Sequence, residues 1–245
     1  MSPTLLVLLC VASVVYAAAG QGGASGYIAV MGLYGVAPEV MRPTALCLNI
    51  LVTGLGTWRL WRAGLGDWRG LWPFLLGSVP CSALGGAVVL PASSYRLVVG
   101  VVLIGAGLRL WRDAGAPAGA EGAPRHPSVA LRAVTGGGIG LLSGLTGIGG
   151  GIFLAPVLLI LRWADARRTA ALTAPFILVN SVAGLAGNWV SVESLPAALP
   201  AYAAVTLVGA LVGSHLAIRF LSPAMLRRIM ALVLLFGGAA VLLRA

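Results

Sequence analysis

The chain of 245 residues contains no lysine and only six acidic residues. Charged residues make up 9% of it and hydrophobic residues 59%, whereas an ordinary soluble protein carries about 25% charged residues. This lack of charge excludes a soluble globular protein and predicts an all-α polytopic membrane protein that lies in a lipid bilayer. All 16 basic residues are arginines, a usage typical of GC-rich bacterial genomes, so we expect the cytoplasmic membrane of a bacterium. In a membrane protein the placement of the positive charges indicates orientation, so the net charge of +10 predicts no nucleic-acid partner.

Sequence patterns of catalysis and metal binding are missing as well. The chain has no Ser–His–Asp set, HExxH motif or Walker sequence, so we expect no enzyme activity. Cys10, Cys47 and Cys81 lie in apolar segments without metal-ligand spacing, so neither a metal nor a cofactor is expected. No Asp or Glu falls within a predicted span, which removes the carboxylate typical of a proton relay or sodium site. His215 is the one candidate titrating side chain in a predicted span.

Ten apolar segments are present, five on each side of a linker rich in Ala, Gly and Pro. They cover residues 3–19, 24–36, 42–58, 70–90, 95–111, 129–143, 149–161, 170–190, 196–218 and 224–243. We therefore divide the chain into a first membrane repeat (1–112), a cytoplasmic linker (113–128) and a second membrane repeat (129–245). Residues 1–19 could be read as a signal peptide, but their start carries no basic residue. Because the second half has a similar segment at 129–142, we interpret residues 1–19 as a structural helix.

A glycine-rich turn occurs once in each half, at residues 20–26 and 144–151. The apolar stretches that follow are shorter than the roughly 20 residues that cross a bilayer core. We interpret each turn as the tip of a helical hairpin that enters the membrane and returns, followed by three spans. Glycine-interrupted segments at corresponding places in two halves indicate the binding site of a transporter.

The arginines test this arrangement. Thirteen of the 16 fall in four regions, 59–69, 109–132, 162–169 and 219–228. If each hairpin returns to its starting side, these regions share one face, which the positive-inside rule makes cytoplasmic. The two repeats are then inverted and both termini face outward. Two full spans in place of each hairpin would leave the same loops on the same sides. The distribution of charge therefore does not distinguish a hairpin from two full spans.

The two turns and nearby polar residues form the candidate site for a small anion. Helix N-termini carry unpaired N–H groups and partial positive charge, and glycine lets a ligand approach the backbone closely. Asn49 and Asn180 each precede a tryptophan by nine residues; their amides either donate to the anion or bond to a neighbouring helix. The glycines have a second interpretation, close packing of helices. The predicted substrate-binding residues are Gln21, Gly22, Gly23, Ser25, Thr44, Asn49, Gly147, Gly149, Gly150, Gly151, Thr173 and Asn180.

The second turn resembles that of the TauE/SafE family. The match rests on Gly147, Gly149-Gly150-Gly151, the Ala155-Pro156 step, Thr173 and Asn180, with a degenerate copy in Gln21-Gly22-Gly23-Ala24-Ser25, Thr44 and Asn49. The first half departs from the family at Ala24-Ser25, where a third glycine and an apolar residue are common. The resemblance implies a secondary transporter of sulfite, organosulfonates or related organic anions, which would work by alternating access. A passive anion channel or a non-transporting subunit of a larger complex is the alternative, and the oligomeric state stays open.

Overall fold

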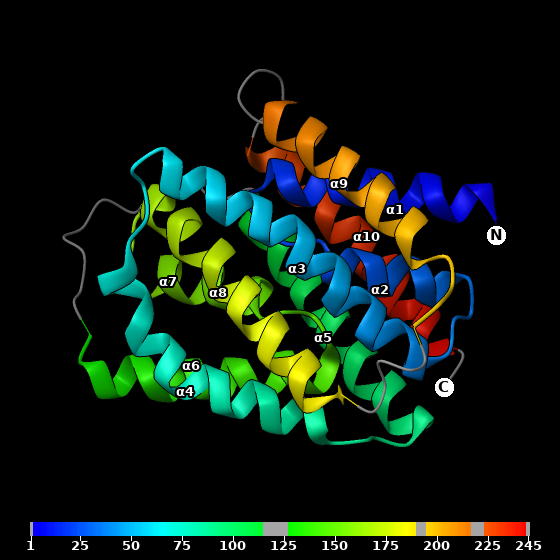
Figure 1. Cartoon of the computed structure of the whole chain (residues 1–245), viewed down its shortest axis with the longest axis horizontal. Helices are drawn as coiled ribbons and strands as arrows, with labels where there is room; N and C mark the ends of the chain where they lie inside the picture. Colours follow the sequence, from blue (N-terminus) through cyan, green and yellow to red (C-terminus); the bar gives the residue numbers. More distant parts are fainter. Residues whose placement is uncertain (1, 115–126, 190–194, 217–222, 244–245) are drawn as a thin grey trace.

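The computed structural model describes residues 2–114, 127–189, 195–216 and 223–243, which form ten α-helices and no strand (Figure 1). The helices are α1 (Pro3–Ala18), α2 (Ala24–Leu33), α3 (Pro38–Arg62), α4 (Trp68–Ala87), α5 (Ala92–Asp113), α6 (Val129–Thr146), α7 (Gly151–Ile160), α8 (Ala166–Gly187), α9 (Leu199–Leu216) and α10 (Pro223–Leu243). The all-helical fold class is therefore confirmed for this part of the chain. Most of the predicted linker, residues 115–126, lies outside the described residues.

The helices differ in how much of a membrane they could cross. Four of them, α3, α5, α6 and α8, are long and apolar enough to span a bilayer. Helices α2 and α7, which follow the glycine turns, have ten residues each, a length of about 15 Å at 1.5 Å per residue. That is half of a hydrocarbon core of about 30 Å, as the short apolar stretches predict. Helix α6, which we expected as one arm of a hairpin, is itself 18 residues long.

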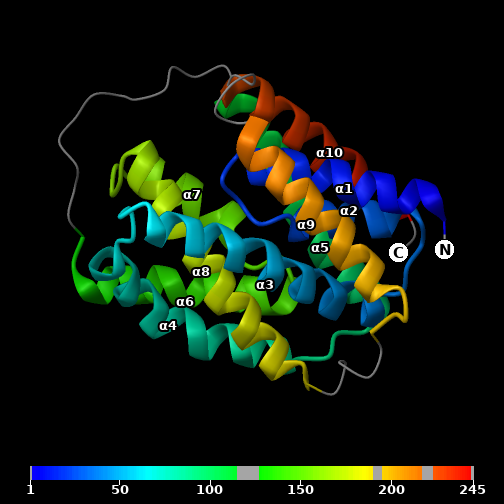
Figure 2. The same cartoon turned by 45° about the horizontal axis from the view of Figure 1, so that its top comes forward.

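Helices of the two halves pack in a reciprocal pattern. Helix α1 lies along α9 and α4 lies along α6, while α3 contacts α8 and α5 contacts α10 (Figures 1 and 2). If the five helices of one half are exchanged with those of the other, the α1–α9 contact becomes the α6–α4 contact and the other two contacts map onto themselves. The halves are therefore interleaved, and each buries its helices against the other.

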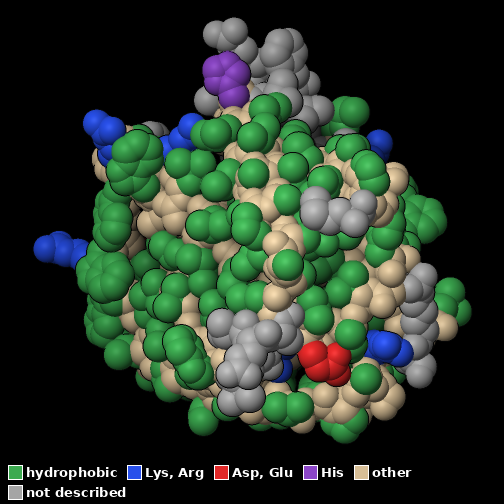
Figure 3. Space-filling model, turned by 45° about the vertical axis from the view of Figure 1, so that its right-hand side comes forward, with side chains coloured by type: hydrophobic (Ala, Val, Ile, Leu, Met, Phe, Trp, Pro, Cys, Tyr) green, Lys and Arg blue, Asp and Glu red, His purple; other side chains and the backbone are tan. Residues whose placement is uncertain are grey.

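Glycine makes the contact between α4 and α6 close. A Cβ atom at Gly136, Gly140 or Gly144 would collide with a backbone carbonyl oxygen of α4. In hydrocarbon, where lipid tails are as apolar as leucine, such close backbone contact is what stabilises a helix pair. The outer surface is apolar, and hydrophobic side chains cover most of the face in Figure 3. Leu84 and Phe236, for example, are 65% and 68% exposed.

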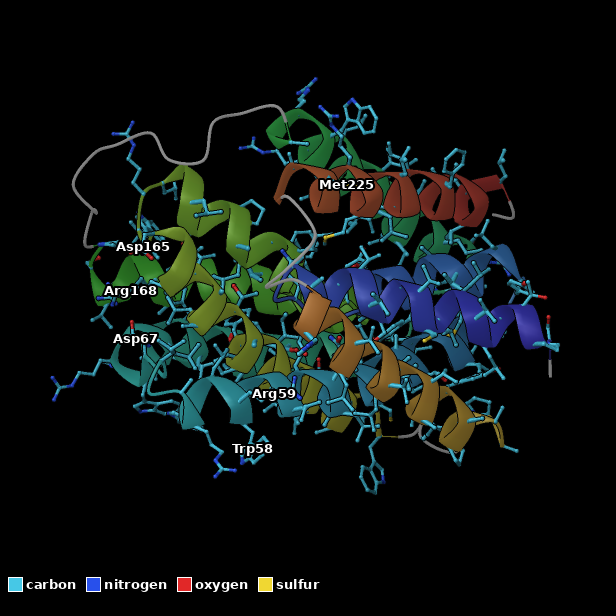
Figure 4. The ribbon with its side chains drawn as sticks, turned by 90° about the horizontal axis from the view of Figure 1, so that it is seen from above. Trp58, Arg59, Asp67, Asp165, Arg168 and Met225 are labelled. Carbon is cyan, nitrogen blue, oxygen red and sulfur yellow. The ribbon has the colours of Figure 1, made fainter. Side chains whose placement is uncertain are left out.

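The two ends of the molecule carry different groups. Helix α1 begins and α10 ends at the same end of the fold (Figures 1 and 2). Asp67, Asp165 and Arg168 lie at the opposite end (Figure 4). There, Arg168 donates from Nε to Asp67 Oδ2 at 2.6 Å, while Asp67 Oδ1 accepts from the N–H of Gly70 at 2.8 Å. This ion pair connects the beginnings of α4 and α8.

Candidate functional site

The first glycine turn joins α1 to α2. Gly20 has a φ of +68°, a left-handed conformation that glycine adopts without steric cost. The next N–H, that of Gln21, donates to the carbonyl of Tyr16 at 2.9 Å. The turn is also held by a side chain, because Ser25 donates to Tyr16 Oη at 3.0 Å. Ser25, a predicted site residue, thus stabilises the turn itself.

The second glycine turn joins α6 to α7 and is more irregular. Gly147, Gly149 and Gly150 have φ angles of +77°, +81° and +84°. Gly147 ends α6, and its N–H donates to the carbonyl of Ser143 at 2.8 Å. Gly147 therefore matches Gly20 of the first turn, whereas the other two left-handed positions have no counterpart there. All residues from 147 to 151 are buried.

Asn49 on α3 connects the two turns. Its side chain is fully buried, and Oδ1 accepts from the N–H of Ala24, the first residue of α2, at 3.2 Å. Its Nδ2 donates to the carbonyl of Ile148 in the second turn at 3.4 Å and to Ser181 Oγ at 3.2 Å. The structure thus brings the turns within reach of one amide group. Gly22 and Gly149 border this amide, since a Cβ at either would collide with it.

Asn180 on α8 differs from Asn49, although both are fully buried. Its Nδ2 donates to the carbonyl of Phe176 in its own helix at 2.8 Å, and its Oδ1 is buried without a partner among the described residues. An unpaired buried polar atom is uncommon and costly. Residues at corresponding places in the sequence therefore make different contacts in this conformation.

The remaining predicted site residues lie around the turns with mixed roles. Thr173 donates to the carbonyl of Thr169 at 2.6 Å, and its methyl group is the part that faces Gly151. Thr44 is fully buried, and its Oγ1 has no partner among the described residues. Gly23 is buried against the ring of Tyr27. For this glycine the contact supports the packing interpretation.

A cavity of about 370 Å³ reaches the first turn. Gly20 and Gln21 of the first turn line it, together with Arg59 of α3 and Ser214 of α9. Arg59 donates from Nη1 to Ser214 Oγ at 2.6 Å, and Figure 4 shows Arg59 on α3. The remaining lining residues are mostly alanine and leucine from α3, α8 and α9, with Thr53. Among the predicted site residues, Gln21 alone lines this cavity.

Sequence reasoning missed several of these residues. Ser214 was not among the predicted site residues, but it accepts the bond from Arg59 at the cavity. Arg42, one of the three arginines outside the four clustered regions, was not among the predicted site residues; it is 5% exposed within α3. The sequence pattern at Arg42 is an arginine followed by Pro43 and an apolar run. This pattern is equally typical of the end of a loop, so it did not indicate a buried arginine.

Comparisons with known proteins identify the family. The family model described as sulfite exporter TauE/SafE matches residues 5–241. A protein of Sinorhizobium fredii, described as probable membrane transporter protein y4hK, is 40% identical over 239 residues, which cover 97% of each chain. No solved structure matches the chain significantly. The motifs of the second glycine turn and the match over nearly the whole chain lead to one conclusion: this protein belongs to the TauE/SafE family of membrane transporters.

Proposed function

We propose that this transporter moves small anions, such as sulfite, organosulfonates or related organic anions, by alternating access at a site between the two glycine turns. The observation that carries the proposal is the position of Asn49. One buried amide bonds to both turns, and a cavity lined by Gln21 and Arg59 reaches the first of them.

The electrostatics of this region favour an anion. Helices α2 and α7 both begin at the turns, so the positive ends of their dipoles lie near Asn49, which accepts from the first N–H of α2. Arg59, which lines the cavity and is exposed, supplies a full positive charge. A charge at the entrance raises the local concentration of oppositely charged ligands. Neutral donors at the site bind the anion weakly, which permits release.

The helix arrangement supports alternating access by two inverted repeats. The reciprocal contacts of α1 with α9 and of α6 with α4 are what a two-fold relation between the halves produces. In inverted-repeat transporters, movement of one group of helices against another exposes a central site to each side in turn. The cavity reaches only the first turn, and the second turn is buried. This is the expected pattern for a conformation open to one side, which the arginine distribution makes the cytoplasm.

Flux into proteoliposomes tests the proposal. The purified chain is reconstituted and supplied with labelled sulfite, methanesulfonate, benzenesulfonate and acetate, one at a time. We expect saturable uptake of at least one of these anions, and counterflow when the same unlabelled anion is inside. Uptake without saturation or counterflow would indicate the passive channel. Absence of flux for the whole panel would contradict the proposal and favour the non-transporting subunit.

A further inference from the structure

The side of the molecule opposite the cavity is closed by contact between α4 and α8. We call this contact the seam and define it by Ser82, Ala83 and Gly86 of α4 with Asn180, Gly184 and Gly187 of α8. A Cβ at Gly86 would collide with the carbonyl of Gly184, and one at Gly187 with that of Ala83. Ser82 donates across the seam to the carbonyl of Asn180 at 2.9 Å.

When the helices of the two halves are exchanged, the seam occupies the place of the cavity. Helix α9 takes the place of α4 in the second half, and α3 takes the place of α8. Gly56 and Gly187 each lie seven residues after a buried asparagine, yet the nearest atom to a Cβ at Gly56 would be Ala174 Cβ at 3.9 Å. The pair α3 and α9 thus borders a cavity, whereas the corresponding pair α8 and α4 is in backbone contact.

Arg42 lies at the end of the seam. It donates from Nη2 to the carbonyls of Gly85 and Gly86 at 2.6 and 2.7 Å, and from Nη1 to that of Val88 at 2.9 Å. These carbonyls are at the C-terminal end of α4, where the helix dipole is negative. Arg42 Nε is buried without a partner among the described residues. The stem of Arg42 borders the second glycine turn, since its Cγ would lie 2.8 Å from a Cβ at Gly147.

A buried guanidinium cannot leave these carbonyls without other acceptors, because an unpaired buried charge is very costly. The oxygens of a sulfonate, sulfite or carboxylate suit it, since its planar fork binds two oxygens at once. We propose that Arg42 is the gate residue of the second access route: it closes the seam by binding the end of α4, and it binds the anion when α4 moves away. This inference rests on the proposed function and gives the transported anion a cation on the side away from Arg59.

Cysteine accessibility tests the closing role without requiring transport. In a background in which Cys10, Cys47 and Cys81 are replaced by alanine, Ser82→Cys reports on the seam and Ala174→Cys reports on the cavity. A water-soluble thiol reagent is added to sealed vesicles on the side opposite Arg59. Because three charge-assisted hydrogen bonds are lost, we expect Arg42→Met to speed modification of Ser82→Cys about tenfold or more. Arg62→Met is the matched control, since Arg62 is exposed on the same helix over the ring of Trp58, and it should change nothing.

Two outcomes overturn the closing role: an unchanged rate at Ser82→Cys, or an equal rise at Ala174→Cys, which would mean general loosening. If Arg42→Met does not reach the membrane, Arg42→Lys serves instead, because its compact ammonium lacks the planar fork with which the guanidinium reaches all three carbonyls. Its expected rise is about threefold, and an unchanged rate overturns the proposal equally.

One-directional flux tests the binding role. Arg42→Lys should raise KM several-fold for an anion added on the side opposite Arg59, and should change KM little from the Arg59 side. Equal effects from both sides would overturn the binding role. Wild-type protein that moves none of the test anions would instead contradict the proposed function, while the accessibility result would still decide whether Arg42 closes the seam.

Discussion

The two glycine turns hold corresponding places in the sequence but lie in different surroundings. Gly20 is exposed and Gln21 half-buried at a cavity, whereas residues 147–151 are all buried. The neighbouring helices show the same difference: a cavity lies between α9 and α3, whereas α4 packs closely on α8. Related segments in unequal environments are what one conformation of a two-state transporter presents. Under the proposed alternating access, the state of the protein would add to the difference that the two turn sequences already make, since Gly149 and Gly150 have no left-handed counterpart in the first turn.

The largest expected effect separates the two buried asparagines. Asn49→Asp keeps the acceptor for the N–H of Ala24 but removes the donors to Ile148 and Ser181 and adds a negative charge. Because like charges repel strongly in a buried site, we expect anion flux to fall by about 100-fold or more. The matched variant is Asn180→Asp, which adds the same charge but loses only a bond within its own helix and none to either turn; its flux should fall less than that of Asn49→Asp, by about tenfold. Initial uptake rates in proteoliposomes measure both, and equal losses would show that the turns contribute alike.

The glycines at the cavity and the seam provide the next comparison. Gly187→Ala places a methyl group against the backbone of Ala83, whereas the methyl group of Gly56→Ala would make only an ordinary contact with Ala174 Cβ at 3.9 Å. Overpacking of this kind costs about 1–3 kcal/mol, so Gly187→Ala should lower the thermal stability in detergent by several degrees. Gly56→Ala should leave it unchanged. Equal stabilities would mean that the seam opens readily and that the contrast between the two sides is small.

The sequence predicts the helices and turns well but the contacts of the site less well. Apolar runs and glycine clusters are local features, so the positions of α2 and α7 follow from them. The difference between Asn49 and Asn180 depends on which backbone groups of the other half come within hydrogen-bond distance, which no local pattern contains. Arg42 is the same case, because its acceptors are the last carbonyls of a helix much later in the chain.

The backbone conformation of the turn glycines limits which of them can be substituted to test ligand binding. Gly150 is the position where a bulky residue would first be tried to exclude the ligand, yet its φ of +84° strains any L side chain. Loss of flux in Gly150→Val therefore cannot distinguish a blocked ligand from a distorted turn. Gln21, which lines the cavity and lies in no left-handed position, is the better place to change the site.

A smaller effect concerns the entrance. Arg59→Gln removes the positive charge at the cavity while keeping a donor for Ser214. We expect KM to rise about three- to tenfold for anions added on the Arg59 side, with the maximal rate nearly unchanged, because entry is helped by long-range attraction. The effect should shrink at high salt, which screens exposed charges. Initial rates at low and high ionic strength measure it, and a loss of maximal rate would give Arg59 a role beyond attraction.

The smallest expected effect is that of His215→Gln. His215 is exposed in the last turn of α9 and follows Ser214, the residue that accepts from Arg59. Histidine is the side chain that commonly couples protons near neutral pH, and His215 is the one histidine in a predicted span. It is not among the residues that line the cavity, however, and both turns present backbone and amide groups that do not titrate. We therefore expect the flux of His215→Gln, and any dependence of that flux on pH, to match the wild type within about twofold. Uptake measured with and without an imposed proton gradient checks this. Selective loss of a pH-dependent component in the variant would instead make the cavity end of α9, and not the pair of turns, the place where protons enter the transport cycle.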